Sequence, residues 1–154
     1  MVEKREVLKQ NLEVLDRCLM RLSESFLKCK AIGIKDEFSE QELTEFEALT
    51  ARFARTIDWF VNKALRSLYK VELEEVVTVL DLLNNAEKRE IIDSAETWED
   101  IKDLRNSIIH DYDVDDFTNE IFKPALQYTS IVERSVAKLK SYCEKYFVTA
   151  PPSV

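Results

Sequence analysis

Apolar residues recur at alternating spacings of three and four along most of the chain, which is the period of an amphipathic α-helix. The first stripe predicts a helix over about residues 2–30, and the only glycine, Gly33, follows it as a stop signal. Ser39 and Glu42 then have the spacing of a capping box, which predicts a second long helix that ends near Tyr69. The two stripes consist of Leu8, Leu12, Leu15, Leu19, Leu22 and Phe26, and of Leu43, Phe46, Leu49, Phe53, Ile57, Phe60, Ala64 and Leu68.

The valine-rich segment 72–85 is ambiguous, because valine favours β-strands. A lone strand would have no pairing partner in this sequence, so we predict a shorter helix that ends around Asn84 and Asn85. Thr97 and Asp100 form a weak capping signature for the helix that follows.

The C-terminal part of the chain predicts one more long helix. The acidic segment 111–116 is expected to break the preceding helix, and the last helix begins at about Phe117. Pro124 lies inside its apolar pattern, so this helix either starts late or kinks there. The tail 148–154 contains two prolines and is expected to be flexible.

Composition agrees with helices throughout. One glycine and three prolines are far fewer than a sheet protein needs for its turns, and 154 residues suit one domain. We therefore predict an all-α fold, with a single domain over 1–147 built as an antiparallel bundle of four to six helices and no sheet. Cys18, Cys29 and Cys143 have no paired spacing, so we expect three core-filling thiols in a reducing compartment.

The net charge of −8 limits the partners that the chain can have. Nonspecific affinity for nucleic acid comes mainly from lysine and arginine side chains that neutralise phosphates. An RNA ligand would therefore have to bind at a local site, and DNA is not expected as a partner. The sequence shows no signal peptide and no apolar run that approaches about 18 residues, so we expect a cytoplasmic protein without a membrane contact.

Chemistry-bearing side chains are concentrated in the segment 104–112. It holds the only histidine, His110, five positions after Arg105 and two before Tyr112. A cation for phosphate, a proton carrier, and an amide and a phenol to orient them are the groups that phosphodiester chemistry without a metal would use. On a helix, Arg105 would fall within the apolar face, while Asn106 and His110 would lie together on its flank. That apolar face consists of Trp98, Ile101, Leu104, Ile108 and Ile109.

Each of these residues also has a structural explanation. A guanidinium on a buried face needs a carboxylate partner from another helix, unless the face opens there into a cleft or a subunit interface. His110 would suit a helix C-terminus, where positive charge is favourable, and Tyr112 could simply pack. The acidic run 111–116 is most simply a solvated loop that caps the next helix, and a magnesium site is the weaker alternative.

The pattern Arg105-Asn106-x-x-x-His110-x-Tyr112 on a helix of an all-helical protein resembles the HEPN superfamily, and within it the HepT branch. That branch has the signature arginine, four residues, histidine, any residue, tyrosine. A second segment, Arg52-Phe53-Ala54-Arg55-Thr56-Ile57-Asp58-Trp59, is similar to the RFE-x-x-x-E-x-W segment of the related nucleotidyltransferase-substrate-binding proteins. Asp58 and Trp59 only approximate that segment. The two resemblances together span roughly residues 5–147.

The resemblance implies a homodimeric helical bundle that cleaves RNA, a tRNA or an mRNA, without a metal or another cofactor. Arg105 and His110 would be the catalytic pair, Asn106 a supporting residue, and Tyr112 the side chain that a cognate nucleotidyltransferase antitoxin of the MNT type modifies with AMP. The chain would then be the toxin of a type VII-like HepT/MNT toxin–antitoxin pair. Two alternatives from other classes stay open: a noncatalytic nucleotide- or substrate-binding partner of a small nucleotidyltransferase, and a helical interaction domain in which Arg105 makes a buried ion pair.

Overall fold

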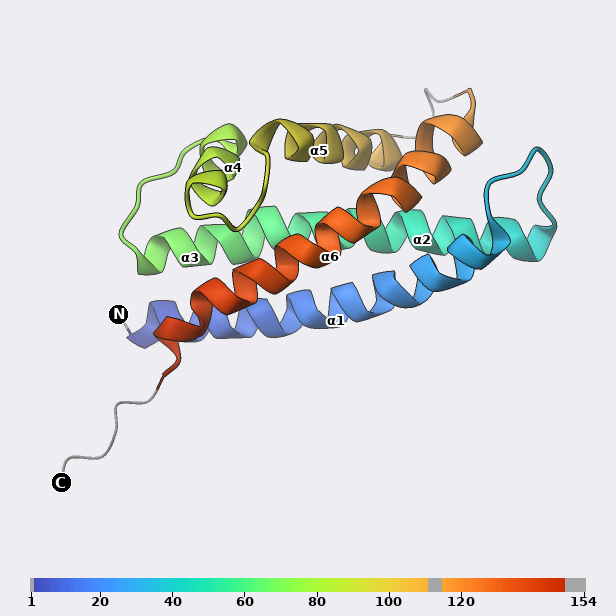
Figure 1. The fold of residues 1–154 in the computed structure, drawn as a ribbon. Helices are drawn as coiled ribbons and strands as arrows, with labels where there is room; N and C mark the ends of the chain where they lie inside the picture. Colours follow the sequence, from blue (N-terminus) through green and yellow to red (C-terminus); the bar gives the residue numbers. More distant parts are fainter. Residues whose placement is uncertain (1, 111–114, 149–154) are drawn as a thin grey trace.

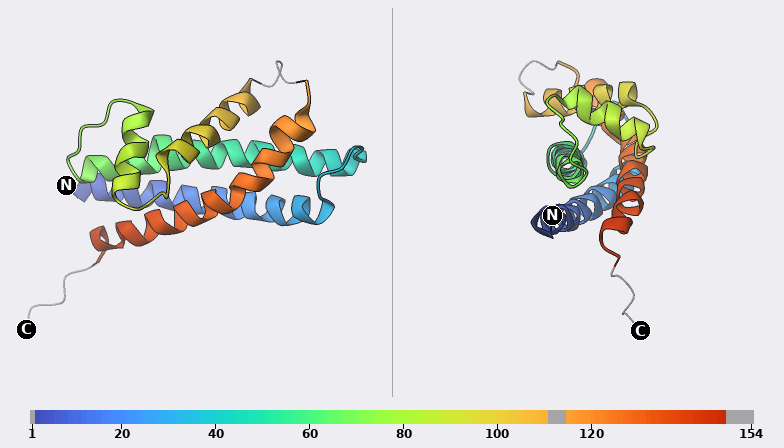
Figure 2. Two further views of the ribbon diagram at one scale, coloured as in Figure 1. Left: turned by 45° about the horizontal axis from the view of Figure 1, so that its top comes forward. Right: turned by 90° about the vertical axis from the view of Figure 1, so that its left-hand side faces the viewer.

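The computed structural model describes residues 2–110 and 115–148, which form helices and no strand. Helix α1 (Val2–Ile32) and helix α2 (Glu40–Asp58) run antiparallel and side by side along the length of the molecule (Figure 1). Helix α6 (Lys123–Cys143) crosses both α2 and α1. Helices α4 (Val79–Lys88) and α5 (Ala95–Ile109) lie on the side of the bundle away from α1. The view along the bundle in Figure 2 shows these helices surrounding one core. The predicted all-α bundle is confirmed.

The second predicted helix is longer than α2 itself. A π-helical segment, η1 (Trp59–Leu65), and helix α3 (Arg66–Val71) continue it without a break. The predicted capping box is present, since the Glu42 backbone N–H donates to Ser39 Oγ at 3.1 Å and the Ser39 N–H donates to Glu42 Oε1 at 2.9 Å. Every residue of the apolar stripe except Leu43 is buried, as the spacing predicted. The π-helical segment was not predicted.

The prediction for the segment 72–85 is wrong at its start. Residues 72–78 are not helical, and α4 begins only after Thr78, which forms a capping box with Asp81. The preceding helix ends at a residue with positive φ, Leu73 (φ 56°), where the Glu74 N–H donates to the Tyr69 carbonyl at 2.9 Å. These two end signals leave the intervening valines in a loop, and α4 then runs three residues beyond Asn85.

Helix α5 begins earlier than the capping signature indicated. Its N-cap is Ser94, whose hydroxyl accepts a hydrogen bond from the Thr97 N–H at 3.1 Å, so Thr97 is the third helical residue and not the cap. The start of α5 is anchored by Trp98, which is buried, stacks on Phe60 with 4.6 Å between ring centroids, and donates from Nε1 to Ser135 Oγ at 3.2 Å.

Helical backbone begins at Phe117, as predicted, and a π-helical turn, η3 (Thr118–Phe122), runs directly into α6. Pro124 therefore lies in the first α-helical turn but not at a late start of the helix. The Lys123 N–H donates to the Thr118 carbonyl, so the hydrogen bonding changes from π-helical to α-helical next to the proline, which has no N–H of its own to donate. Helix α6 is followed by a short 3₁₀ turn, η4 (Glu144–Tyr146).

The predicted thiols Cys18, Cys29 and Cys143 are all buried and free, as expected. Burial raises the pKa of the Cys143 thiol to about 12 and that of Cys29 to about 11, which suits inert core residues. No helix in the described residues is both long enough and apolar enough to cross a bilayer. Of the tail 148–154, only Val148 belongs to the described residues.

Candidate functional site

Arg105 on α5 reaches the end of α2, where it meets Asp58. Its Nη2 donates to Asp58 Oδ2 at 2.9 Å, and its Nε lies 2.8 Å from Asp58 Oδ1. Its Nη1 also donates to Asn106 Oδ1 at 3.1 Å, so the two neighbouring motif residues are in contact through their side chains. The predicted carboxylate partner from another helix therefore exists.

The Arg105 side chain is held but not enclosed. The exposed fraction of the Arg105 side chain is 28%, and that of the Asp58 side chain is 34%. A guanidinium has five N–H donors, and the hydrogen bonds engage one on each terminal nitrogen, which leaves one N–H on each of them; Nε contacts Asp58 by charge alone. The apolar-face prediction is correct for Trp98, Ile101 and Leu104, which are buried, while Arg105 lies half-buried at the edge. For Ile109 it is wrong, because α5 reaches the surface there.

His110 is the residue at which α5 ends. Its backbone N–H donates to the Asn106 carbonyl at 3.0 Å, and its backbone leaves the helical conformation (φ −113°, ψ 50°). The residue is exposed. The last turn of α5 thus presents Arg105 and Asn106 at its start and His110 at its end. Tyr112, the fourth candidate, lies outside the described residues, as do Asp111 and Asp113.

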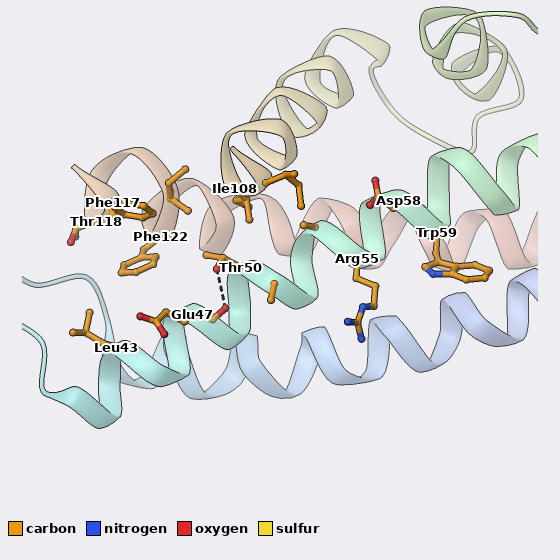
Figure 3. A pocket seen from close by; sticks show the side chains of 14 residues that line it. Leu43, Glu47, Thr50, Arg55, Asp58, Trp59, Ile108, Phe117, Thr118 and Phe122 are labelled. Carbon is orange, nitrogen blue, oxygen red and sulfur yellow. Dashed lines mark hydrogen bonds between the residues drawn. The ribbon is translucent and has the colours of Figure 1, made fainter. Parts of the chain in front are cut away.

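An apolar groove of about 870 Å³ lies beside this turn, between α2, the end of α5 and η3 (Figure 3). Two of its large apolar lining residues are exposed, Ile109 at 50% and Phe117 at 37%. Figure 3 shows Asp58 leaving α2 on the side away from α1, and Arg55 leaving it toward α1. The groove is lined by Leu43, Glu47, Thr50, Ala51, Ala54, Arg55, Asp58, Trp59, Ile108, Ile109, Phe117, Thr118, Ile121 and Phe122.

Asp116 supports the capping explanation of the acidic run. Its Oδ1 accepts from the Asn119 N–H at 3.1 Å, and its Oδ2 accepts from Asn119 Nδ2 at 2.9 Å. These hydrogen bonds lower the pKa of the Asp116 carboxyl, so it is an anionic cap for the segment that starts α6. Within residues 2–110 and 115–148, no three histidine, cysteine or carboxylate side chains are grouped as a metal site would require.

Sequence reasoning missed two features of the surroundings of the motif. The first is the pairing of Asp58 with Arg105, because the sequence does not specify which carboxylate lies opposite the arginine. The second is a basic cavity on the α1 side of α2, where arginines from both helices meet. The spacing of Arg17 and Arg21, four apart, and of Arg52 and Arg55, three apart, places each pair on one helix face. Which faces meet depends on how α1 packs on α2, and the spacing does not specify this.

In comparison with known proteins, no protein-family model and no curated protein matches the chain. The structure brings together a half-buried Arg105 and an exposed His110 at the end of α5, with Asp58 from the segment 52–59 in contact with the arginine.

Proposed function

We propose that the chain is a metal-independent endoribonuclease that acts as a homodimer. The observation that carries the proposal is the arrangement on the last turn of α5. There Asp58 and Asn106 hold the Arg105 guanidinium with two N–H groups left over, and the exposed His110 lies one turn further on. This combines a fixed phosphate cation with a group that can transfer protons.

The reaction would be an internal transfer at phosphorus. One His110 imidazole takes the proton of a ribose 2′-hydroxyl, and the 2′-oxygen forms a bond to the adjacent phosphorus. The bond from phosphorus to the 5′-oxygen breaks, and a protonated imidazole gives its proton to that oxygen. The products are a 2′,3′-cyclic phosphate and a 5′-hydroxyl. Arg105 would stabilise the extra negative charge on the phosphate oxygens in the transition state.

A dimer supplies the second imidazole that this scheme needs, since each chain has a single histidine. The apolar groove supports this arrangement, because it borders the same turn of α5 and exposes Ile109 and Phe117. Exposed large apolar residues gathered in one groove are typical of an interaction surface. We place the dimer contact there, so that two copies of the motif share one cleft.

The regulatory part of the proposal concerns Tyr112 and depends on the sequence motif alone. A cytoplasmic nucleotidyltransferase antitoxin of the MNT type would transfer AMP to Tyr112, two residues after His110. A bulky anion at that position would block RNA both sterically and by charge. The chain would then be the toxin of a type VII-like pair.

A second function is favoured by one observation, the ion pair itself. An arginine that is already paired with Asp58 within its own chain can be purely structural, and the net charge of −8 disfavours RNA capture. The chain would then be a noncatalytic partner that presents or receives a nucleotide for a small nucleotidyltransferase.

The test is RNA cleavage by purified, unmodified protein in the presence of a chelator. We expect cleavage to 2′,3′-cyclic phosphate ends, and we expect Arg105→Ala and His110→Ala to abolish it. Ser107→Ala is the matched control, because Ser107 is exposed on the same turn of α5 and should leave the rate unchanged. Ile109→Asp should yield monomers and abolish cleavage together.

Absence of cleavage by the unmodified dimer would contradict the enzyme proposal and leave the noncatalytic function. Co-expression with a small nucleotidyltransferase, followed by intact-mass measurement, tests the regulation. We expect added AMP on the wild-type chain and none on Tyr112→Phe, and an unchanged wild-type mass would contradict the antitoxin mechanism.

A further inference from the structure

Four arginine side chains meet around one cavity between α1 and α2, on the other side of α2 from the apolar groove. Arg17 and Arg21 come from α1, and Arg52 and Arg55 come from α2. The cavity has a volume of about 340 Å³ and is completed by Val14, Cys18 and Trp59. Arg17, Arg21 and Arg55 are exposed, and Arg52 and Trp59 are half-buried.

In the part of the chain that the structure describes, none of these four guanidinium groups forms an ion pair. Two neighbouring carboxylates are engaged elsewhere: Asp16 lies 3.0 Å from Lys140 Nζ, and Asp58 is held by Arg105. Four like charges around one cavity repel one another, and a bound anion would relieve that repulsion.

Part of the cavity is preorganised. Arg52 Nη1 donates to the Arg21 carbonyl at 3.2 Å and to Ser25 Oγ at 2.8 Å, which fixes the guanidinium across the α1–α2 contact. The positive charges of three of these arginines also act on the buried Cys18 thiol. Burial raises the pKa of this thiol, while Arg55, Arg17 and Arg21 all act to lower it. An anion in the cavity would lie in the same positive field.

We propose that this arginine cavity binds backbone phosphates of single-stranded RNA, with Trp59 as a surface on which a base stacks. Arginine forms paired hydrogen bonds with phosphate, and a positive groove next to an aromatic side chain is the usual form of a single-strand binding site. The inference rests on the proposed ribonuclease function for its choice of RNA. A net charge of −8 disfavours RNA binding over the whole surface, but the four arginines provide a local positive site for it.

The cavity is connected to the motif side of α2. Arg55 and Trp59 line both the arginine cavity and the apolar groove, and the groove in turn is bordered by Ile108 and Ile109, directly before His110. Figure 3 shows Arg55 and Trp59 one turn apart at the edge of α2 that faces α1. In the proposed dimer, whose contact occupies the groove, a strand anchored in the cavity would reach the shared cleft from the edge of that contact.

The experiment is binding of a fluorescently labelled 2′-O-methyl oligonucleotide, which lacks the attacking hydroxyl and cannot be cleaved. The test variant is Arg17→Gln/Arg21→Gln, since both side chains are exposed on α1. Each phosphate contact contributes about −0.7 to the slope of log K against log salt for single strands, so losing two should weaken binding by roughly 25-fold at 0.1 M salt. The slope should become shallower by about 1.4.

Lys4→Gln/Lys9→Gln is the matched control, because it removes the same charge from exposed positions of the same helix away from the cavity. We expect it to weaken binding by less than about threefold. Equal weakening by both variants, or no weakening by either, would overturn the inference. Competition by ATP or pyrophosphate as effective as that by the oligonucleotide would also overturn it, in favour of a free nucleotide or phosphate.

Binding and catalysis fail separately in this design. His110→Ala should bind the oligonucleotide as the wild type does. Arginine-dependent binding by a protein that never cleaves RNA would support the inference and contradict the ribonuclease. RNA cleavage by a protein whose oligonucleotide binding is unchanged in Arg17→Gln/Arg21→Gln would support the ribonuclease and contradict the inference.

Discussion

Arg105 and Asp58 are 47 residues apart in sequence and form a two-point ion pair between the last turns of α5 and α2. Arg105 Nη2 donates to Asp58 Oδ2 at 2.9 Å, and Nε lies 2.8 Å from Oδ1 as an ion-pair contact that lacks hydrogen-bond geometry. A second hydrogen bond, from Nη1 to Asn106 Oδ1, helps to position the guanidinium. The pair therefore connects the two segments of the chain that resemble the HEPN superfamily and its relatives.

The pair can be measured by a double-mutant cycle of Asp58→Asn and Arg105→Gln. Because both side chains remain about one-third exposed, solvent screens the attraction, and we expect a coupling of about 1 kcal/mol in the free energy of unfolding. Urea unfolding of the four proteins provides the measurement. A coupling near zero would show that the pair does not position the guanidinium. If Asp58 acts through Arg105, Asp58→Asn should also lower kcat, and Asp58→Glu should partly restore it.

Glu72, directly after α3, joins the end of α4 to the end of α6 and should make stability depend on pH. Its Oε1 accepts from Arg89 Nε at 2.7 Å, and its Oε2 accepts from the hydroxyls of Tyr142 and Tyr146. Burial alone would raise the pKa of this carboxyl, but the hydrogen bonds from both tyrosines and Arg89 outweigh burial and lower it. A lowered folded-state pKa means a contribution that is complete above the unfolded-state pKa and is lost as pH falls through the folded-state pKa.

Glu72→Gln should therefore destabilise the protein by about 2 kcal/mol at pH 7, with a difference from wild type that shrinks below about pH 4. Urea unfolding at pH 7 and at pH 3 measures both values. Glu74→Gln is the matched control, because its carboxylate contacts the same arginine at 3.4 Å but remains 44% exposed, and it should change stability by less than about 0.5 kcal/mol. An undiminished difference at pH 3 would contradict the assignment to the Glu72 charge.

Position 73 should tolerate glycine better than alanine. It ends α3 in the left-handed conformation at φ 56°, which costs a residue with a Cβ about 1 kcal/mol, and its side chain is 70% exposed. Glycine avoids that cost but loses more entropy on folding, so Leu73→Gly should exceed Leu73→Ala in stability by about 0.5 kcal/mol. Thermal and urea unfolding of both variants test this. A glycine variant less stable than the alanine variant would show that the entropy lost by glycine outweighs the strain of a Cβ at this φ.

Local signals in this chain predicted local structure well where both partners lie within a few residues. The Ser39–Glu42 capping box and the stop at Gly33 are of this kind, and both are present. The prediction for 72–85 failed because the helix end at Leu73 uses a left-handed leucine where glycine is the usual signal. The spacing of Thr97 and Asp100 also predicts a cap wrongly, because Ser94, three residues earlier, is the N-cap of α5.

By itself, the sequence determined the helical fold, most of the buried face of each helix and the presence of Arg105, Asn106 and His110 on one helical turn, because these follow from the period of the α-helix. Only the tertiary structure decided which carboxylate holds Arg105, that Ile109 is exposed beside a groove, and that arginines from α1 and α2 share a cavity. Those features depend on how helices far apart in sequence pack against each other, and packing is set by side-chain shape across the whole core.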